Sequence, residues 1–354
     1  MASGVAGGAV LAAGAAVPIV VMAGWFGSGG WMNISRSDML HAVVASLAVA
    51  ALVPRRAVRV GALLSAAGVL AAYLVHTPVG LNATRLATLF ALPLVAAYAD
   101  VPGWLRRAGA RATLGRGVSR AAGSLVLALL LAALAWWQPP VLRQDLTSGG
   151  DPTAAPGYFA PLAAELAARS PAGRVEVIPT ARYWESAHLD STPLARGWLR
   201  QVDLGQNSLF FEDPLDPEDY RRWLVDNGVS YVALAAAPGS WVGRPEAALV
   251  RQGVPYLTPV WSSPDWTLYA VAGGPGIVQP PATLLSATAD GVEFTVPGPG
   301  PGPVAVKVRW SRWLAISGTG QACLAPAGDW TTVQVAEPGR YRITGSVTAP
   351  GPRC

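Results

Sequence analysis

The chain has 354 residues, of which 52% are hydrophobic and 13% are charged, and its formal net charge is +5. So apolar and charge-poor a composition is not that of an ordinary water-soluble protein. Much of the basic excess lies in short clusters beside apolar segments, a pattern that reports membrane topology and argues against a nucleic-acid partner.

Five apolar stretches predict a transmembrane helical region over residues 1–140. A bilayer core about 30 Å thick needs roughly 20 helical residues, so the first and last stretches fit once their flanks are included. The middle three are short and need uncharged neighbours to complete them. The stretches are 5–26, 39–53, 60–75, 86–99 and 121–137.

Arginine clusters set the expected orientation. They lie between the second and third stretches and between the fourth and fifth, and short arginine-rich loops stay on the cytoplasmic side. We therefore expect a multi-pass plasma-membrane protein with a cytoplasmic N-terminus and a large extracytoplasmic part after Trp137. The cluster residues are Arg55, Arg56, Arg59, Arg106, Arg107, Arg111, Arg116 and Arg120.

Arg85 lies at the expected outer mouth of the fourth stretch. A charge there is costly unless it reaches the headgroups, pairs with another group or meets an anionic ligand. One interpretation is that Arg85 simply reaches toward membrane lipids. The other is that Arg85, with Asn82 beside it and Arg36 in the facing loop, binds a lipid phosphate.

The pattern changes to that of an extracytoplasmic α/β domain over residues 141–274. Helical spacing over 158–169 is followed by strand alternation over 174–179. A helix over 217–227, opened by Asp216 as its cap, is followed by a buried strand over 230–234. The order helix then strand recurs at 245–251 and 260–271, which predicts a small, mostly parallel sheet covered by helices.

Residues 275–354 read as a small antiparallel β-sandwich module. Alternating strands separated by Gly/Pro turns are expected at 283–287, 292–296, 304–310, 331–335 and 339–347. Cys323 and Cys354 both fall in this module. A disulfide is expected because the module lies on the oxidising face, and two free thiols are the alternative.

Two stretches that combine tryptophan with charged residues follow the first strand of the α/β domain, where open parallel sheets place their ligand crevice. A sugar ring can stack on an indole face and form hydrogen bonds with neighbouring acids and amides. The alternative is that these tryptophans pack the domain against the membrane helices. The candidate glycan-binding residues are Arg182, Trp184, Glu185, Arg196, Trp198, Gln201 and Asp203.

Other chemistry is not indicated. The three histidines, His41, His76 and His188, are scattered, so we expect no metal site. The chain has no phosphate-binding glycine loop and no nucleophile-elbow motif, and we expect no cofactor.

Several runs carry a family resemblance. They are LNATRLATLFALP at 81–93, RVEVIPTARYWESAHL at 174–189, PLARGWLRQVDLGQN at 193–207, YRRWLVDNGVSYVAL at 220–234 and VPYLTPVWSSPDWTLYAV at 254–271. In these runs and in the order of its elements, the chain resembles the C-terminal half of largely uncharacterised actinobacterial polytopic membrane proteins of the GT-C glycosyltransferase type.

The resemblance implies transfer of a sugar from a polyprenyl-phosphate donor to a cell-envelope glycan. It also implies an acidic base in the first outer loop, where the loop at 27–38 offers only Asp38 as a candidate. The N-terminal bundle of such proteins is not evident, so the chain is expected to be a C-terminal half or fragment, with or without catalytic activity, or to work beside a partner protein. The alternative is a membrane-anchored extracytoplasmic module that binds glycan or protein, and a transporter is less favoured.

Overall fold

A computed structural model describes residues 2–27, 30–99, 116–137, 149–170, 172–189, 191–199, 201–288, 290–298, 302–348 and 351–354. The chain divides into two compact units. The first contains residues 1–150 and 200–206, and the second contains residues 151–199 and 207–354. Residues 200–206 therefore group with the N-terminal helices and not with the α/β domain in which the sequence pattern places them.

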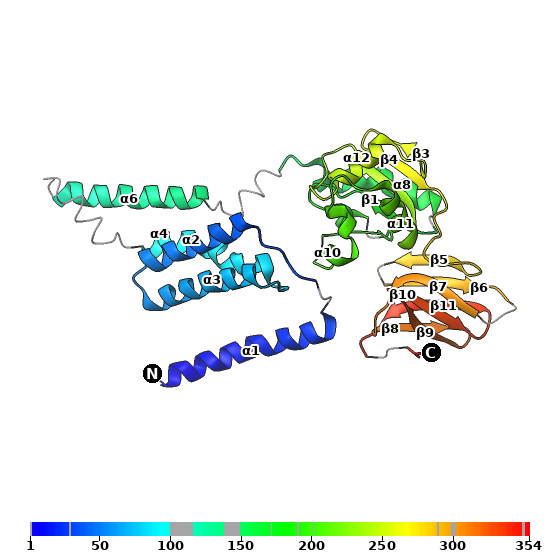
Figure 1. Cartoon of the computed structure of the whole chain (residues 1–354), viewed down its shortest axis with the longest axis horizontal. Helices are drawn as coiled ribbons and strands as arrows, with labels where there is room; N and C mark the ends of the chain where they lie inside the picture. The colour runs from blue at the N-terminus through cyan, green and yellow to red at the C-terminus, as the bar shows by residue number, and fades with distance from the viewer. Residues whose placement is uncertain are drawn as a thin grey trace. The chain divides into compact units, whose positions relative to one another are not determined.

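The first unit is helical (Figure 1). Its elements are α1 (Ala2–Phe26), α2 (Arg36–Leu52), α3 (Arg56–Leu74), η1 (Gly80–Thr84), α4 (Arg85–Tyr98), α6 (Arg116–Trp137) and the short α10 (Asp203–Gln206). The start of α2 is fixed by Ser35, whose hydroxyl accepts a hydrogen bond from the backbone N–H of Asp38 at 3.0 Å. The 3₁₀ turn η1 runs directly into α4, and together they form one apolar stretch over 80–98.

The predicted five-span membrane bundle is wrong. Within the described residues, two helical stretches are long and apolar enough to cross a membrane, Arg56–Leu74 and Gly80–Tyr98. Helix α2 has 17 residues, and the described apolar parts of α1 and α6 are the shorter stretches Ala13–Phe26 and Leu125–Trp137. A helix rises 1.5 Å per residue, so α2 by itself falls short of a core about 30 Å thick. Three arginines of the clusters that set the expected orientation, Arg106, Arg107 and Arg111, lie outside the described residues.

Helices α2, α3 and α4 pack through small side chains. Their shared core is made mostly of alanine and valine, whereas leucines point outward, with Leu63 52% exposed and Leu64 67% exposed. Ser46 donates a hydrogen bond to Ser65 between α2 and α3 at 3.2 Å. The core residues include Ala42, Ala45, Val49, Ala62, Ala66, Val69, Ala87, Ala91 and Val95.

The α/β part of the second unit has a four-stranded sheet of order β1-β2-β4-β3. The strands are β1 (Arg174–Val177), β2 (Val229–Ala235), β3 (Leu257–Ser262) and β4 (Trp266–Val271). Its helices are α8 (Pro156–Arg169), α9 (Glu185–His188), α11 (Pro217–Asp226) and α12 (Arg244–Gln252), with the 3₁₀ turns η2 (Pro152–Ala154) and η3 (Ser208–Phe211). Two clusters of buried apolar side chains form its core, centred on Leu224 and Val232 in one and on Phe159 and Trp266 in the other.

The expected mostly parallel sheet is also wrong. Strands β1 and β2 are parallel, but β4 is antiparallel to both of its neighbours. The segment 260–271, expected to be one strand, is broken by a turn in which the Ser263 hydroxyl accepts from the backbone N–H groups of Asp265 and Trp266. The resulting hairpin makes β3 an edge strand, and its register shifts between Pro259 and Trp261.

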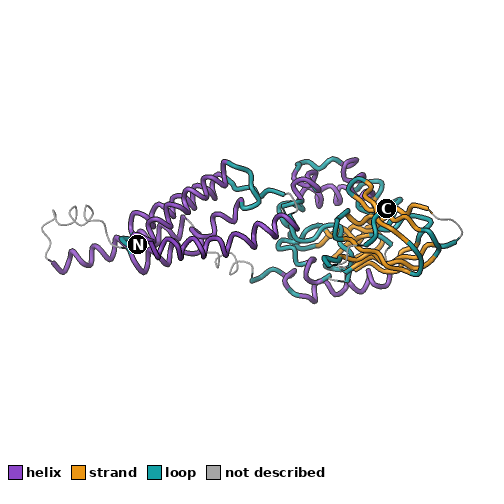
Figure 2. The backbone as a smooth tube through the Cα atoms, turned by 90° about the horizontal axis from the view of Figure 1, so that it is seen from below, coloured by secondary structure: helices purple, strands orange, loops and turns teal. Residues whose placement is uncertain are grey.

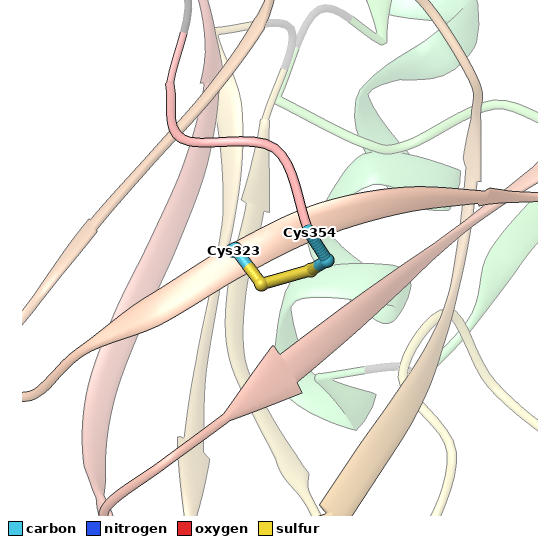
Figure 3. The surroundings of a disulfide bond; sticks show 2 residues. All are labelled: Cys323 and Cys354. Atoms are coloured by element: carbon cyan, nitrogen blue, oxygen red, sulfur yellow. A yellow bond between two sulfur atoms is a disulfide. The ribbon is translucent and has the colours of Figure 1, made fainter.

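The C-terminal residues form two antiparallel sheets of order β7-β10-β9 and β5-β6-β11-β8, coloured orange with the other strands in Figure 2. They share one apolar core that includes Phe294, Val306, Val333 and Tyr341. Cys323 on β9 is joined by a disulfide bond to Cys354, so the terminal segment lies against that strand (Figure 3). The strands are β5 (Thr283–Thr288), β6 (Gly291–Val296), β7 (Gly302–Arg309), β8 (Leu314–Gly318), β9 (Ala322–Ala327), β10 (Trp330–Val335) and β11 (Gly339–Gly345).

Candidate functional site

The loops that follow β1 and β2 meet at one edge of the α/β sheet. Because the two strands are parallel, their carboxyl ends lie at the same edge. The loops are tied together, since the backbone N–H of Ser240 donates to the carbonyl of Pro179 at 2.9 Å and Thr180 bridges to Gly239. Side chains on these two loops are therefore held near a common point.

Four aromatic side chains, which we call the aromatic edge, lie on these loops: Tyr183, Trp184, Trp198 and Trp241. The rings of Tyr183 and Trp198 lie 5.6 Å apart, and Trp198 is 63% exposed. Trp184 stacks on His188 at 5.5 Å with an interplanar angle of 14°. Trp241 is 57% exposed and lies against Phe211. The edge thus offers indole surface to solvent on a folded scaffold.

A buried hydrogen-bond network fixes the first of these loops. The Thr180 hydroxyl donates to Glu185 Oε2 at 2.6 Å and accepts from the backbone N–H of Trp184 at 3.1 Å. Tyr183 between them has a φ of 59°, in the left-handed region that costs a non-glycine residue free energy. Burial raises the pKa of Glu185 to about 7, although the hydrogen bonds from Thr180 act in the opposite direction.

A buried ion cluster supports the segment that carries Trp198. Arg196 Nε donates to Glu176 Oε1 at 2.9 Å, and the same guanidinium also bonds Glu246. Tyr220 donates its hydroxyl to the other oxygen of Glu246 at 2.7 Å, and the guanidinium lies 3.3 Å from the ring centroid of Phe210. Both carboxylates are fully buried. Since Arg196 precedes Trp198 by two residues, the cluster fastens the tryptophan loop to the sheet.

The cluster has more carboxylates than cations. Burial, reinforced by the charge of Glu246, raises the pKa of Glu176 to about 8, while Arg196 acts in the opposite direction. Glu176 Oε2 is buried without a hydrogen-bond partner among the described residues. A proton on Glu176 near neutral pH would relieve the negative charge that one guanidinium shares between two carboxylates.

The structure separates the predicted glycan-binding residues into three groups. Arg182, Trp184 and Trp198 lie on the loops at the aromatic edge, with Arg182 half-buried. Glu185 and Arg196 are buried, and their hydrogen bonds support the loops that carry the aromatic edge. Gln201 and Asp203 belong to the first unit, where Gln201 Nε2 donates to the carbonyl of Pro78 at 2.7 Å and Asp203 opens α10.

The predicted lipid-phosphate residues lie at one end of the helical unit. Arg36 begins α2 and Arg85 begins α4, and both side chains are exposed. The segments that precede α2 and η1 are joined by a hydrogen bond from the backbone N–H of Met32 to the carbonyl of Thr77 at 3.2 Å, so the two helix starts and Asn82 in η1 lie toward the same end of this unit. The proposed base, Asp38, accepts a hydrogen bond from the Ser35 hydroxyl at 2.7 Å. Its carboxylate is thereby engaged in the cap of α2.

Sequence reasoning missed Trp241 and the buried partners of Arg196. Trp241 could have been found, because it follows the second parallel strand just as Trp184 follows the first. Glu176, Tyr220 and Glu246 carry no such signal, since their meeting with Arg196 depends on packing between separate elements.

No group of three or more metal-ligating side chains occurs among the described residues. Comparisons with family models, with curated proteins and with solved structures found no match.

Proposed function

We propose that this chain is a membrane-anchored envelope protein whose α/β part binds a glycan at the aromatic edge. The observation that carries the proposal is the exposure of Trp198 and Trp241 on two loops that the sheet and the ion cluster hold together. Exposed tryptophans on a fixed scaffold bind ligands with little loss of side-chain entropy.

The polar neighbours of the edge favour a sugar over a purely apolar ligand. His188 stacks under Trp184, the phenol of Tyr183 accompanies Trp198, and Arg182 lies on the same loop. These side chains offer apolar ring faces together with hydrogen-bonding groups. A pyranose matches them, because it has both apolar faces and hydroxyl groups.

The anchoring part of the proposal rests on the helical unit. Alanines fill the contacts between α2, α3 and α4, and leucines point outward, which is the arrangement that suits helices packed in lipid. The disulfide supports placement of the second unit in an oxidising compartment, which agrees with an extracytoplasmic location.

The test uses the full chain in nanodiscs and a panel of labelled neutral oligosaccharides: cellohexaose, maltoheptaose, mannohexaose and chitohexaose. We expect at least one to bind, and Trp198→Ala to weaken that binding about tenfold, since loss of one stacking aromatic costs on the order of 1–2 kcal/mol. The matched control is Trp136→Ala, which removes an 81% exposed tryptophan from α6 in the other unit.

Equal affinities of the Trp198→Ala and Trp136→Ala variants would contradict a role for the edge. Failure of every oligosaccharide to bind the folded parent chain would contradict a site for neutral glycans. Trp198→Phe, which keeps a ring, should retain part of the affinity and distinguishes lost stacking from a disturbed loop.

A second candidate is the glycosyltransferase-like activity that the family resemblance implies. It is favoured by the common position of Arg36, Asn82 and Arg85 at one end of the helical unit, where a polyprenyl phosphate would meet two cations. Membranes containing this chain, with and without a partner protein, would be assayed for transfer from a radiolabelled polyprenyl-phosphate sugar. Loss of transfer activity in Arg85→Ala and in Asp38→Asn would favour this candidate. Absence of transfer by the parent chain would favour the glycan-binding protein.

A further inference from the structure

Three cations surround Trp330 at the start of β10. The charged groups of Arg174, Lys307 and Arg309 lie 5.9, 5.4 and 4.8 Å from the centroid of its ring. Lys307 and Arg309 are both on β7, Arg309 pairs with Trp330, and the register of the two strands shifts beside this pair, so that both cations lie near the same ring. The indole is half-buried beneath them.

The adjoining loop repeats the combination of arginine and tryptophan. The guanidinium of Arg353 lies 4.8 Å from the centroid of the Trp310 ring, and that of Arg312 lies 4.7 Å from the Trp313 ring. The terminal segment is held there by the disulfide and by hydrogen bonds from the backbone N–H of Leu324 to Pro352 and of Cys354 to Leu324. We call this surface the cationic tryptophan face; it comprises Lys307, Arg309, Trp310, Arg312, Trp313, Trp330 and Arg353.

Positive charge is crowded on this face. Arg309 is paired with Asp329 at 3.1 Å, but Asp329 is itself 79% exposed. Arg174 donates to the backbone carbonyls of Asn227 and Lys307, and Arg353 donates to those of Arg312 and Leu314. Carbonyl oxygens carry no net charge, so these hydrogen bonds do not neutralise the cationic charge of either side chain. Burial lowers the pKa of Arg174 to about 10, and the nearby charge of Arg309 acts in the same direction.

We propose that the cationic tryptophan face binds an anionic glycan, whose carboxylate or phosphate groups contact Lys307 and Arg309 while its sugar rings lie against the indole edges. Guanidinium groups bind these anionic oxygens with charge-assisted hydrogen bonds, and a bound anion relieves the repulsion between the cations. This site is separate from the aromatic edge, because it is built on the β-sandwich and is selected by charge.

A glycan fits this face better than a lipid surface does. Surfaces that enter a bilayer interface present large exposed apolar side chains beside their cations. In the described part of the second unit such exposed side chains are Trp198, Trp241, Leu285 and Val347, and none of them belongs to the face. The tryptophans of the face are half-buried between strands and cations. They therefore present ring edges, and not a protruding side chain that would insert into a bilayer.

The test measures binding of fluorescent polygalacturonate, which carries carboxylates, and phosphomannan, which carries phosphates, to the full chain in zwitterionic nanodiscs. We expect at least one of them to bind in a salt-dependent manner, and Lys307→Glu/Arg309→Glu to weaken that binding at least tenfold. The matched control, Arg251→Glu/Arg342→Glu, makes the same change in net charge at two exposed arginines away from the face and should alter affinity less than twofold.

Three results would overturn the proposal: no binding of either acidic glycan, equal weakening in both double variants, or equally tight binding of polyglutamate of matched charge. Tighter binding of phosphatidylglycerol vesicles than of the glycans, abolished by the same double variant, would assign the face to lipid instead. If Lys307→Glu/Arg309→Glu does not fold, judged by its unfolding midpoint, the milder Lys307→Gln/Arg309→Gln decides the same question.

Discussion

Arg196 joins two buried carboxylates that come from different elements, Glu176 on β1 and Glu246 on α12. Replacing a buried pair by apolar residues is often tolerated, but removal of one partner leaves an uncompensated charge inside the protein. The residue therefore couples stability of the α/β sheet to the position of the loop that carries Trp198.

We expect Arg196→Leu to lower the free energy of unfolding of the second unit by about 3–5 kcal/mol, because Glu176 and Glu246 would lose their cation. Chemical unfolding of the full chain, followed by tryptophan fluorescence, measures the change. The control is Arg251→Leu, an exposed arginine in the last turn of α12, for which we expect a change below about 1 kcal/mol. Similar losses in the two variants would show that the cluster contributes no special stability.

The buried carboxylates also predict a pH dependence. The pKa of Glu185 is raised to about 7 and that of Glu176 to about 8, from an ordinary value of 4.5. The folded protein thus keeps protons that the unfolded chain has released, so the stabilising contribution is complete below about pH 4.5 and is lost as the pH rises through 7 and 8. Titration of Glu185 alone should lower the free energy of unfolding by on the order of 2–3 kcal/mol between pH 5 and 8, and Glu176 adds to this decline.

Glu185→Gln should flatten this decline, because the amide keeps an acceptor for Thr180 and does not ionise. Glu212→Gln, at an exposed position, should leave the decline unchanged. A parent chain whose stability is constant from pH 5 to 8 would show that these carboxyl groups do not titrate as burial demands.

At the residue level, sequence reasoning found side chains whose position follows from one strand end, such as Trp184 and Trp198. It could not assign Glu185 and Arg196 to a supporting role, because Glu185 contacts Thr180 within its own loop and Arg196 contacts carboxylates of two other elements, β1 and α12. Polarity alone does not distinguish a group that faces a ligand from one that holds the loop.

Among the elements, the small-residue contacts of α2, α3 and α4 make a clear prediction. Ala45 is fully buried in α2, so Ala45→Leu should overpack the helix contact and lower stability by about 1–3 kcal/mol. Leu63→Ala on the outward face of α3 should cost less than about 1 kcal/mol, because no cavity forms. Thermal unfolding in detergent compares them, and the reverse order would contradict the outward orientation of the leucines.

The disulfide supports a second prediction at this scale. Cys323 and Cys354 are 31 residues apart, and closing a loop of that length stabilises the folded state by about 3–4 kcal/mol in the chain-entropy view. We expect reductant, or Cys323→Ser/Cys354→Ser, to lower the unfolding midpoint of the sandwich. Reductant should have no further effect on the double variant, and an effect there would point to a different target.

Elements with strong local signals were predictable. Asp216 caps α11 by accepting hydrogen bonds from the backbone N–H groups of Glu218 and Asp219, and strand alternation located β1, β2 and β6 within a few residues. The β3–β4 hairpin was missed although Ser263, Pro264 and Asp265 separate its two apolar runs, because the whole segment was assigned to one strand. Strands β8 and β9 were missed because they lack a clean alternation of buried and exposed residues.

For the whole molecule, the proposed anchoring predicts behaviour in membranes. The chain should remain in the membrane pellet after alkaline carbonate washing, because α3 and the stretch formed by η1 and α4 are long enough to cross the core. Leu64→Arg, on the exposed face of α3, should reduce insertion, whereas Leu285→Arg on the exposed surface of the sandwich should not. Release of the parent chain into the wash would contradict membrane anchoring.

Sequence composition predicted the change from a helical to a strand-rich half but not where the compact units divide. Apolar content marks which residues avoid water, yet it does not fix how many helices reach across a bilayer, since that depends on the length of each continuous helix. The grouping of 200–206 with the first unit follows from contacts such as that of Gln201 with Pro78, which no local pattern encodes.

Edge strand β3 has a consequence for the behaviour of the protein in concentrated solution. An unpaired strand edge can recruit the edge of another molecule and start aggregation. Pro259 lacks the N–H that such a neighbour needs, and the register shift beside it disturbs the flat row of backbone groups. The proline and the register shift thus protect the α/β sheet from growing between molecules.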